Sequence, residues 1–230
     1  MEKEDIRRYV WDLLVKKGVA RFPFPVEGRI PNFKGAEVAA LNLSRTPEWR
    51  LSSVIFVNPD SPQRFVRHLA LMQGKVVIMS TPRLRRGFLL LDPSRIMPRN
   101  YWEASSIRGA FKHGTEIGLN VPRVDLKVTG SVAVDESGNR IGKGHGYSDL
   151  EYGILGEIGA ITEETPVATT VHDLQVLKEV PSEEHDMPVS LIVTPTRIIR
   201  TGRKGSPKIF WEKIGEELLK EIPLLSELKP

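Results

Sequence analysis

The chain has 230 residues, of which 40% are hydrophobic and 27% charged, and its net charge is +4. It contains no cysteine, which excludes disulfides, thiolate nucleophiles and cysteine-ligated zinc. The small basic excess suits anionic partners such as nucleotides, but it is too weak to predict nucleic-acid binding by itself. There is no run of about 18 apolar residues and no signal-peptide pattern in the charged first residues. We therefore expect no membrane partner and a cytoplasmic location.

The first half of the chain alternates helical and strand patterns. Apolar residues recur at helical spacing over residues 4–17, and Gly18 ends the pattern. A proline-rich connector follows, and it leads into a second short helical pattern over residues 34–43. The patterns that come next predict strands at 52–60, 75–82 and 87–93 and a helix at 62–74.

The second half of the chain repeats this rhythm. Residues 125–134 read as one strand, a helix begins near Asp149, and the remaining patterns are β-rich runs at 166–173 and 189–195 and a helix at 210–222. Most of these strands do not alternate, which is typical of strands buried on both faces. With helices between them, they predict an α/β fold with an open, mostly parallel sheet in an α/β/α sandwich.

A domain boundary near residues 95–120 is only weakly signalled. We therefore expect a single α/β domain over residues 1–230.

Glycines alternate with cations in the stretch GNRIGKGHGYSDLEYG. Gly142, Gly144 and Gly146 allow the backbone to approach an anion closely. Arg140 and Lys143 add full positive charges, and the following helix N-terminus favours phosphate. The stretch matches neither the Walker pattern nor the Rossmann fingerprint. It therefore predicts a phosphate site, with a simple glycine-rich turn as the alternative.

Two residues near the loop have open roles. Asp149 suits Mg²⁺ better than phosphate, because carboxylate oxygens are preferred ligands of that ion. Alternatively, Asp149 caps the helix that follows. His145 either contacts a phosphate or is an exposed loop histidine.

The same stretch resembles the R-L-G-x-G-x-G-Y-Y-D loop of the 5-formyltetrahydrofolate cyclo-ligase family. The resemblance covers nearly the whole chain. The stretches RIPNFKG, TPRLR, GSVAV, VHDLQV and TPTR are most similar to the methenyltetrahydrofolate synthetase domain-containing branch. The resemblance implies the fold that this family shares with sugar-phosphate isomerases and CoA transferases. It also implies ATP- and Mg²⁺-dependent conversion of 5-formyltetrahydrofolate, a reduced folate, to 5,10-methenyltetrahydrofolate.

The resemblance also implies roles for individual residues. Asp60 falls near the family's folate-binding glutamate, and we expect it and Lys143 to act in catalysis. Asp149 matches the family's Mg²⁺ ligand. The residues that would bind the nucleotide are Lys3, Arg7, Arg140, Gly142, Lys143, Gly144, His145, Gly146 and Tyr147.

The pterin-binding half departs from the family pattern. Leu84 stands near a usual tyrosine, Leu119 near a usual tryptophan, and Ser148 at the second tyrosine of the loop. These losses predict weaker folate binding, unless Tyr101 or Trp102 supplies a ring, or a different substrate.

Two rival functions therefore stay open. One is a nucleotide- or RNA-binding module without cyclo-ligase activity, because the resembled branch carries an RNA-recognition domain after this region. The other is a kinase-like or ligase enzyme acting on a different small molecule.

Other clusters carry weaker signals. The arginines of PRLRRG could hold a folate tail or a phosphate, or simply end a strand in solvent. His172 and Asp173, like His185 and Asp186, are adjacent in sequence and would face opposite ways in a strand. We therefore expect VHD to end a strand and EEHD to form a turn, rather than a catalytic metal site.

Overall fold

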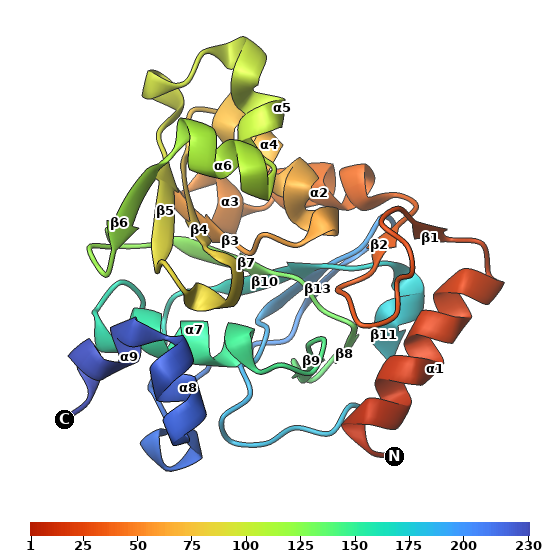
Figure 1. The fold of residues 1–230 in the computed structure, drawn as a ribbon. Helices are drawn as coiled ribbons and strands as arrows, with labels where there is room; N and C mark the ends of the chain where they lie inside the picture. Colours follow the sequence, from red (N-terminus) through yellow and green to blue (C-terminus); the bar gives the residue numbers. More distant parts are fainter.

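The computed structural model describes residues 1–230, and a large sheet flanked by helices dominates it (Figure 1). The strands of this sheet are β3 (Val54–Val57), β4 (Val76–Ser80), β5 (Phe88–Leu91), β6 (Thr115–Gly118), β7 (Leu126–Thr129), β10 (Val167–Thr170), β12 (Leu191–Val193) and β13 (Ile198–Arg200). Their spatial order is β13-β12-β10-β7-β3-β4-β5-β6. The five strands from β12 to β4 pair in parallel, and the outer pairs are antiparallel. The mostly parallel sheet predicted from the sequence is confirmed.

Smaller strands and the helices complete the fold. A second sheet contains β8 (Ala133–Asp135), β9 (Arg140–Ile141) and β11 (Val176–Leu177), and a short hairpin contains β1 (Ala20–Arg21) and β2 (Asn32–Phe33). The helices are α1 (Lys3–Lys16), α2 (Ala36–Ser44), α3 (Pro47–Arg50), α4 (Arg64–Met72), α5 (Tyr101–Ala104), α6 (Ile107–His113), α7 (Tyr147–Glu157), α8 (Glu216–Glu221) and α9 (Pro223–Leu228). No helix combines the length and apolar character needed to cross a bilayer.

Helices cover both faces of the main sheet, and each face has its own core (Figure 1). In β3, Ile55 and Val57 belong to the core beneath α2–α6, whereas Phe56 belongs to the core beneath α7–α9. All three side chains are buried, which explains why the strand reads as a continuous apolar run. A third core joins α1 to the small sheet.

The prediction of one strand over residues 125–134 is wrong. The chain leaves the main sheet after β7 and enters the small sheet at β8. Gly130 lies at this break, where a Cβ would come within 2.7 Å of Gln63 Oε1 and 2.9 Å of Asp60 Oδ2. A side chain at this position would force these neighbouring side chains to shift, so glycine suits the close approach at the break. As a result, the glycine loop follows the β8–β9 hairpin, not a strand of the main sheet.

Two helix predictions need correction. Helix α7 begins at Tyr147, directly after Gly146, whose φ of 73° lies in the left-handed region. Asp149 therefore lies inside the first helical turn and does not cap the helix. The single helix expected over residues 210–222 is instead a 3₁₀ turn at Trp211–Lys213 followed by α8. By contrast, the helices expected at 4–17 and 62–74 are confirmed as α1 and α4.

Candidate functional site

A cavity of about 520 Å³ lies where β3 and β4 end and the glycine loop enters α7. The N-terminal turns of α1 and the turn at residues 183–186 complete its wall. The carboxyl ends of parallel strands are the usual ligand-binding edge of an open α/β sheet. All the site residues predicted from the sequence line this cavity: Lys3, Arg7, Asp60, Arg140, Gly142, Lys143, Gly144, His145, Gly146, Tyr147 and Asp149.

Two arginines hold the glycine loop in place. Arg7 Nε donates to the Gly142 carbonyl at 2.7 Å. Arg140 Nε and Nη2 both donate to the Gly130 carbonyl, at 3.0 and 2.6 Å. No backbone N–H of residues 142–146 donates a hydrogen bond within the chain. The loop is thus fixed through carbonyls, and its N–H groups remain available to an anion.

Lys143 is the least engaged cation of the cavity. Its side chain is 41% exposed, and its ammonium lies 4.0 Å from Asp60 Oδ1, a distant contact for an ion pair. Burial raises the pKa of Asp60, although Lys143, Arg67 and Arg140 act in the opposite direction. Arg67 donates to the Asp60 carbonyl at 3.0 Å and fixes the turn that carries this carboxyl group.

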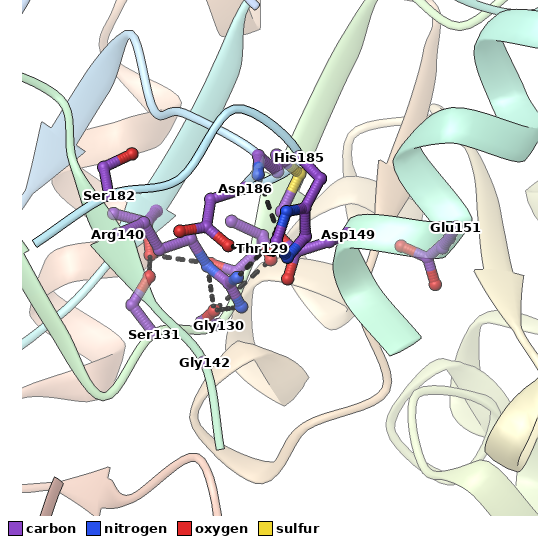
Figure 2. Close-up of polar contacts among 12 residues, drawn as sticks. Thr129, Gly130, Ser131, Arg140, Gly142, Asp149, Glu151, Ser182, His185 and Asp186 are labelled. Atoms are coloured by element: carbon purple, nitrogen blue, oxygen red, sulfur yellow. Dashed lines mark hydrogen bonds and ion pairs between the residues drawn. The ribbon is translucent and has the colours of Figure 1, made fainter. Parts of the chain in front are cut away.

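Asp149 and Arg140 both line the cavity, and Figure 2 shows the two side chains near each other. Its Oδ1 accepts the Met187 N–H at 2.7 Å and lies 3.8 Å from Arg140 Nη1. Burial raises the pKa of Asp149, while Arg140 and the Met187 N–H oppose the shift. Its second oxygen accepts no hydrogen bond from the chain, so one carboxylate oxygen is left for a cation.

Lys3 faces a cluster that the sequence analysis did not place in the site. Its ammonium contacts Asp186 at 2.5 Å and Glu183 at 3.0 Å. Burial lowers the pKa of Lys3, but the hydrogen bonds to these two carboxylates outweigh it, and the pKa is raised. Glu183, His185 and Asp186 lie close together in the turn that the sequence predicts, and Figure 2 shows His185 and Asp186 near Arg140. The Lys3 charge is therefore already paired with protein carboxylates.

Three neighbouring residues were not expected in the site: Asn58 and Glu151, which line the cavity, and Lys127, which contacts both of them. Lys127 Nζ lies 2.9 Å from Glu151 Oε1, and the two side chains are 0% and 3% exposed. Asn58 Nδ2 donates to both Glu151 oxygens, at 2.9 and 3.2 Å. Burial lowers the pKa of Lys127, and Glu151 opposes that shift. The available signal was a lysine within the apolar strand pattern DLKVTG.

Only some of the positions expected to contact a pterin line the cavity. Leu84 and Ser148 line the cavity, and Leu84 has a φ of 57°. Leu119 lies outside the cavity, packed against the core beneath α7–α9. Tyr101 and Trp102 are also outside, so the suggestion that they replace the missing rings is wrong for this structure. Trp102 instead stacks on the Arg64 guanidinium at 3.9 Å.

Of the three arginines of PRLRRG, only Arg83 lines the cavity. Arg86 is paired with Glu116.

Comparisons with known proteins point to one family. The sequence model of the 5-formyltetrahydrofolate cyclo-ligase family matches residues 1–195. Methenyltetrahydrofolate synthase domain-containing proteins of Bos taurus and Homo sapiens are each 42% identical over the whole chain, which covers 62% of each of them. The chain thus spans about six-tenths of the length of these relatives. The 5-formyltetrahydrofolate cyclo-ligase of Escherichia coli (strain K12) is 34% identical over 80 residues, which are 35% of this chain and 41% of that enzyme.

Solved structures support the fold. The Aquifex aeolicus 5,10-methenyltetrahydrofolate synthetase aligns with a TM-score of 0.57 at 20% identity, over 93% of this chain and 100% of that one. The Mycoplasma pneumoniae 5,10-methenyltetrahydrofolate synthetase aligns with a TM-score of 0.51 at 11% identity, over 84% of this chain and 98% of that one. At these identities the likeness concerns the fold alone.

Proposed function

The chain belongs to the 5-formyltetrahydrofolate cyclo-ligase family, and from this premise we propose that it converts 5-formyltetrahydrofolate to 5,10-methenyltetrahydrofolate with ATP and Mg²⁺. We further propose that residues 1–230 act as a single domain in this reaction. The observation that carries the proposal is the convergence of the predicted site residues on one cavity. Residues far apart in sequence, such as Lys3, Asp60 and Lys143, meet there beside the glycine loop.

The glycine loop is suited to the phosphates of ATP. The N–H groups of residues 142–146 are free, and the α7 N-terminus directly follows them. Oriented N–H groups and a helix N-terminus both favour phosphate oxygens. Lys143 adds a charge that no close carboxylate neutralises. Arg7 and Arg140 act by holding the loop, since their donors are directed to its carbonyls and to Gly130.

The donor set fits a magnesium ion at Asp149. Mg²⁺ is commonly held by one or two carboxylates together with substrate phosphates and water. Asp149 offers one unengaged oxygen, and its other oxygen is oriented by the Met187 N–H. The ion, when bound, would neutralise charge on the phosphates. Asp186 is a poorer second ligand, because Lys3 already contacts it.

The chain does not need a covalent nucleophile for this reaction. The formyl oxygen of the folate attacks the γ-phosphorus of ATP. The bond between this phosphorus and ADP breaks, and an imidate-like phosphate forms. The N10 nitrogen then attacks the former formyl carbon and gives up its proton to solvent, and phosphate leaves with the former formyl oxygen. Both steps depend mainly on positioning and on neutralising charge. The roles proposed here are that Lys143 stabilises the transferring phosphoryl group and that Asp60 orients the folate.

One assay tests the proposal. The chain is mixed with 5-formyltetrahydrofolate, ATP and Mg²⁺, and the absorbance of 5,10-methenyltetrahydrofolate is followed. Omission of ATP, and separately of Mg²⁺, should abolish the signal. If ATP is hydrolysed only with another small molecule, the enzyme acts on a different substrate. Tight RNA binding without any ATP-dependent chemistry would instead favour a binding module.

A further inference from the structure

The cavity floor, defined as Asn58, Lys127 and Glu151, holds a buried ion pair that the proposed reaction steps do not use. Its three residues come from the end of β3, from the middle of β7 and from the second turn of α7. Pairing of Phe56 with Lys127 places the lysine beside β3. Figure 2 shows Glu151 well apart from Arg140 and Gly142, so the floor is separate from the loop that faces the phosphates.

A pair of this kind is weak evidence for stability. Removing two charges from water costs about as much as their attraction returns, and apolar replacements of similar volume are often at least as stable. Lys127 lies in a strand whose other residues include buried Leu126 and Val128, where an apolar side chain would also fit. The ammonium lies 4.9 Å from the Phe56 ring centre, and its hydrogen bonds go to Glu151 and to Asn58 Oδ1. The arrangement therefore calls for a reason other than packing.

The geometry leaves Glu151 able to accept hydrogen bonds from a ligand. Oε1 accepts from both Lys127 and Asn58, whereas Oε2 accepts only the 3.2 Å contact from Asn58. Glu151 and Asn58 both line the cavity. Lys127 lies outside the cavity lining and neutralises the charge of the Glu151 carboxylate. A ligand that contacts Glu151 therefore need not carry a positive charge. The carboxylate would repel phosphate, which favours a neutral group with N–H donors here.

We propose that Glu151 determines substrate specificity by accepting, at Oε2, an N–H of the exocyclic amino group of a neutral heterocycle such as a 2-amino-4-oxo ring. Lys127 and Asn58 are positioning residues that fix the orientation of the carboxylate. The inference rests on the proposed function, because the pterin ring of a reduced folate carries this amino group. It deepens that function by assigning the polar edge of the pterin to the floor.

The test compares two small probes, pterin (2-amino-4-oxopteridine) and 4-oxopteridine, which lacks the amino group. Binding is measured by calorimetry on the full chain. The wild type should bind pterin at least about tenfold more tightly, because a site built for donors rejects an analogue without them. Lys127→Met combined with Glu151→Gln removes both charges and keeps an acceptor for Asn58. This variant should lose the preference while its ATP affinity stays within about twofold of wild type.

Two results would overturn the proposal. One is a wild type that shows no preference for pterin over 4-oxopteridine, and the other is a double variant that keeps the wild-type preference. If the double variant does not fold, Glu151→Asp keeps the ion pair but withdraws the carboxylate by one methylene, and an unchanged preference in that variant overturns the proposal as well. A wild type that prefers pterin but does not convert 5-formyltetrahydrofolate supports the floor assignment and refutes the proposed function, so the two failures are distinguishable.

Discussion

The glycine-loop rim and the cavity floor differ in how exposed their charged groups are and in how they are assembled from the chain. The rim consists of residues 140–149 with Arg7. Apart from Arg7 it is continuous in sequence, and its cation Lys143 is 41% exposed. The floor combines three separate elements, and its ion pair is almost completely buried. A motif-like rim can be recognised from its spacing, whereas the floor exists only after β3, β7 and α7 have come together. Substitutions that change one region alone therefore distinguish the contributions of the rim and the floor.

The largest effect is expected at the edge of the rim, for Asp149→Asn. Asparagine keeps an oxygen that can accept the Met187 N–H, so the fold should survive. It removes the negative charge that Mg²⁺ needs, and metal ions contribute several kcal/mol to phosphoryl transfer. We expect turnover of 5-formyltetrahydrofolate to fall by at least about a hundredfold, since about 1.4 kcal/mol corresponds to a factor of ten. A Mg²⁺ titration of the methenyltetrahydrofolate signal measures the loss.

The binding of pterin to the floor should not change in this variant. If turnover in Asp149→Asn stays near the wild-type level, the metal site lies elsewhere in the cavity.

Lys143→Ala tests the phosphate role of the rim. The substitution removes a charge-assisted contact worth about 1.5–3 kcal/mol when it is desolvated. ATP affinity, measured by calorimetry, should fall by roughly ten- to a hundredfold. Lys17→Ala is the matched control, because Lys17 is exposed at the end of α1 and does not line the cavity. Equal ATP affinity in the two variants would leave the loop as a structural turn.

The contrast between rim and floor also explains what the sequence could predict. The parallel sheet was predictable, because strands such as Ile55–Val57 are buried on both faces and read as apolar runs. The break at Gly130 was not, because it depends on Gln63 and Asp60 approaching from another part of the chain. The rim residues were predictable from local spacing and family likeness. Glu151 was not, because only the folded chain shows its contact with Lys127.

A smaller effect is expected at Leu84, which lines the cavity and stands where the family resemblance places a pterin-stacking ring. Leu84→Tyr offers a ring to the ligand, and an aromatic pair adds about 0.5–1.5 kcal/mol beyond burial. The KM for 5-formyltetrahydrofolate should fall roughly two- to tenfold while kcat stays near its starting value, as expected for uniform binding. Leu119→Trp is the comparison, because Leu119 lies outside the cavity and should leave KM unchanged.

Steady-state kinetics on both variants, with thermal unfolding as the check on packing, decides this prediction. An equal KM change in the two variants would contradict the division of the pterin positions seen in the structure.

The smallest effect concerns stability and pH in the free chain. Burial raises the pKa of Asp149 above its usual value of 3.8, so the folded chain holds this proton to a higher pH than the unfolded chain does. The resulting stabilisation is fully present below about pH 3.8 and is lost as pH rises through the folded pKa. Asp149→Asn cannot titrate, so its Tm relative to wild type should increase from pH 4 to pH 7. For a chain of this size about 1 kcal/mol shifts Tm by roughly 2–4 °C, and a few degrees are expected. Glu227→Gln, at an exposed position of α9, serves as the control. A Tm difference that is constant with pH, or that decreases toward pH 7, would contradict the raised pKa of Asp149 and show that Arg140 and the Met187 N–H outweigh burial.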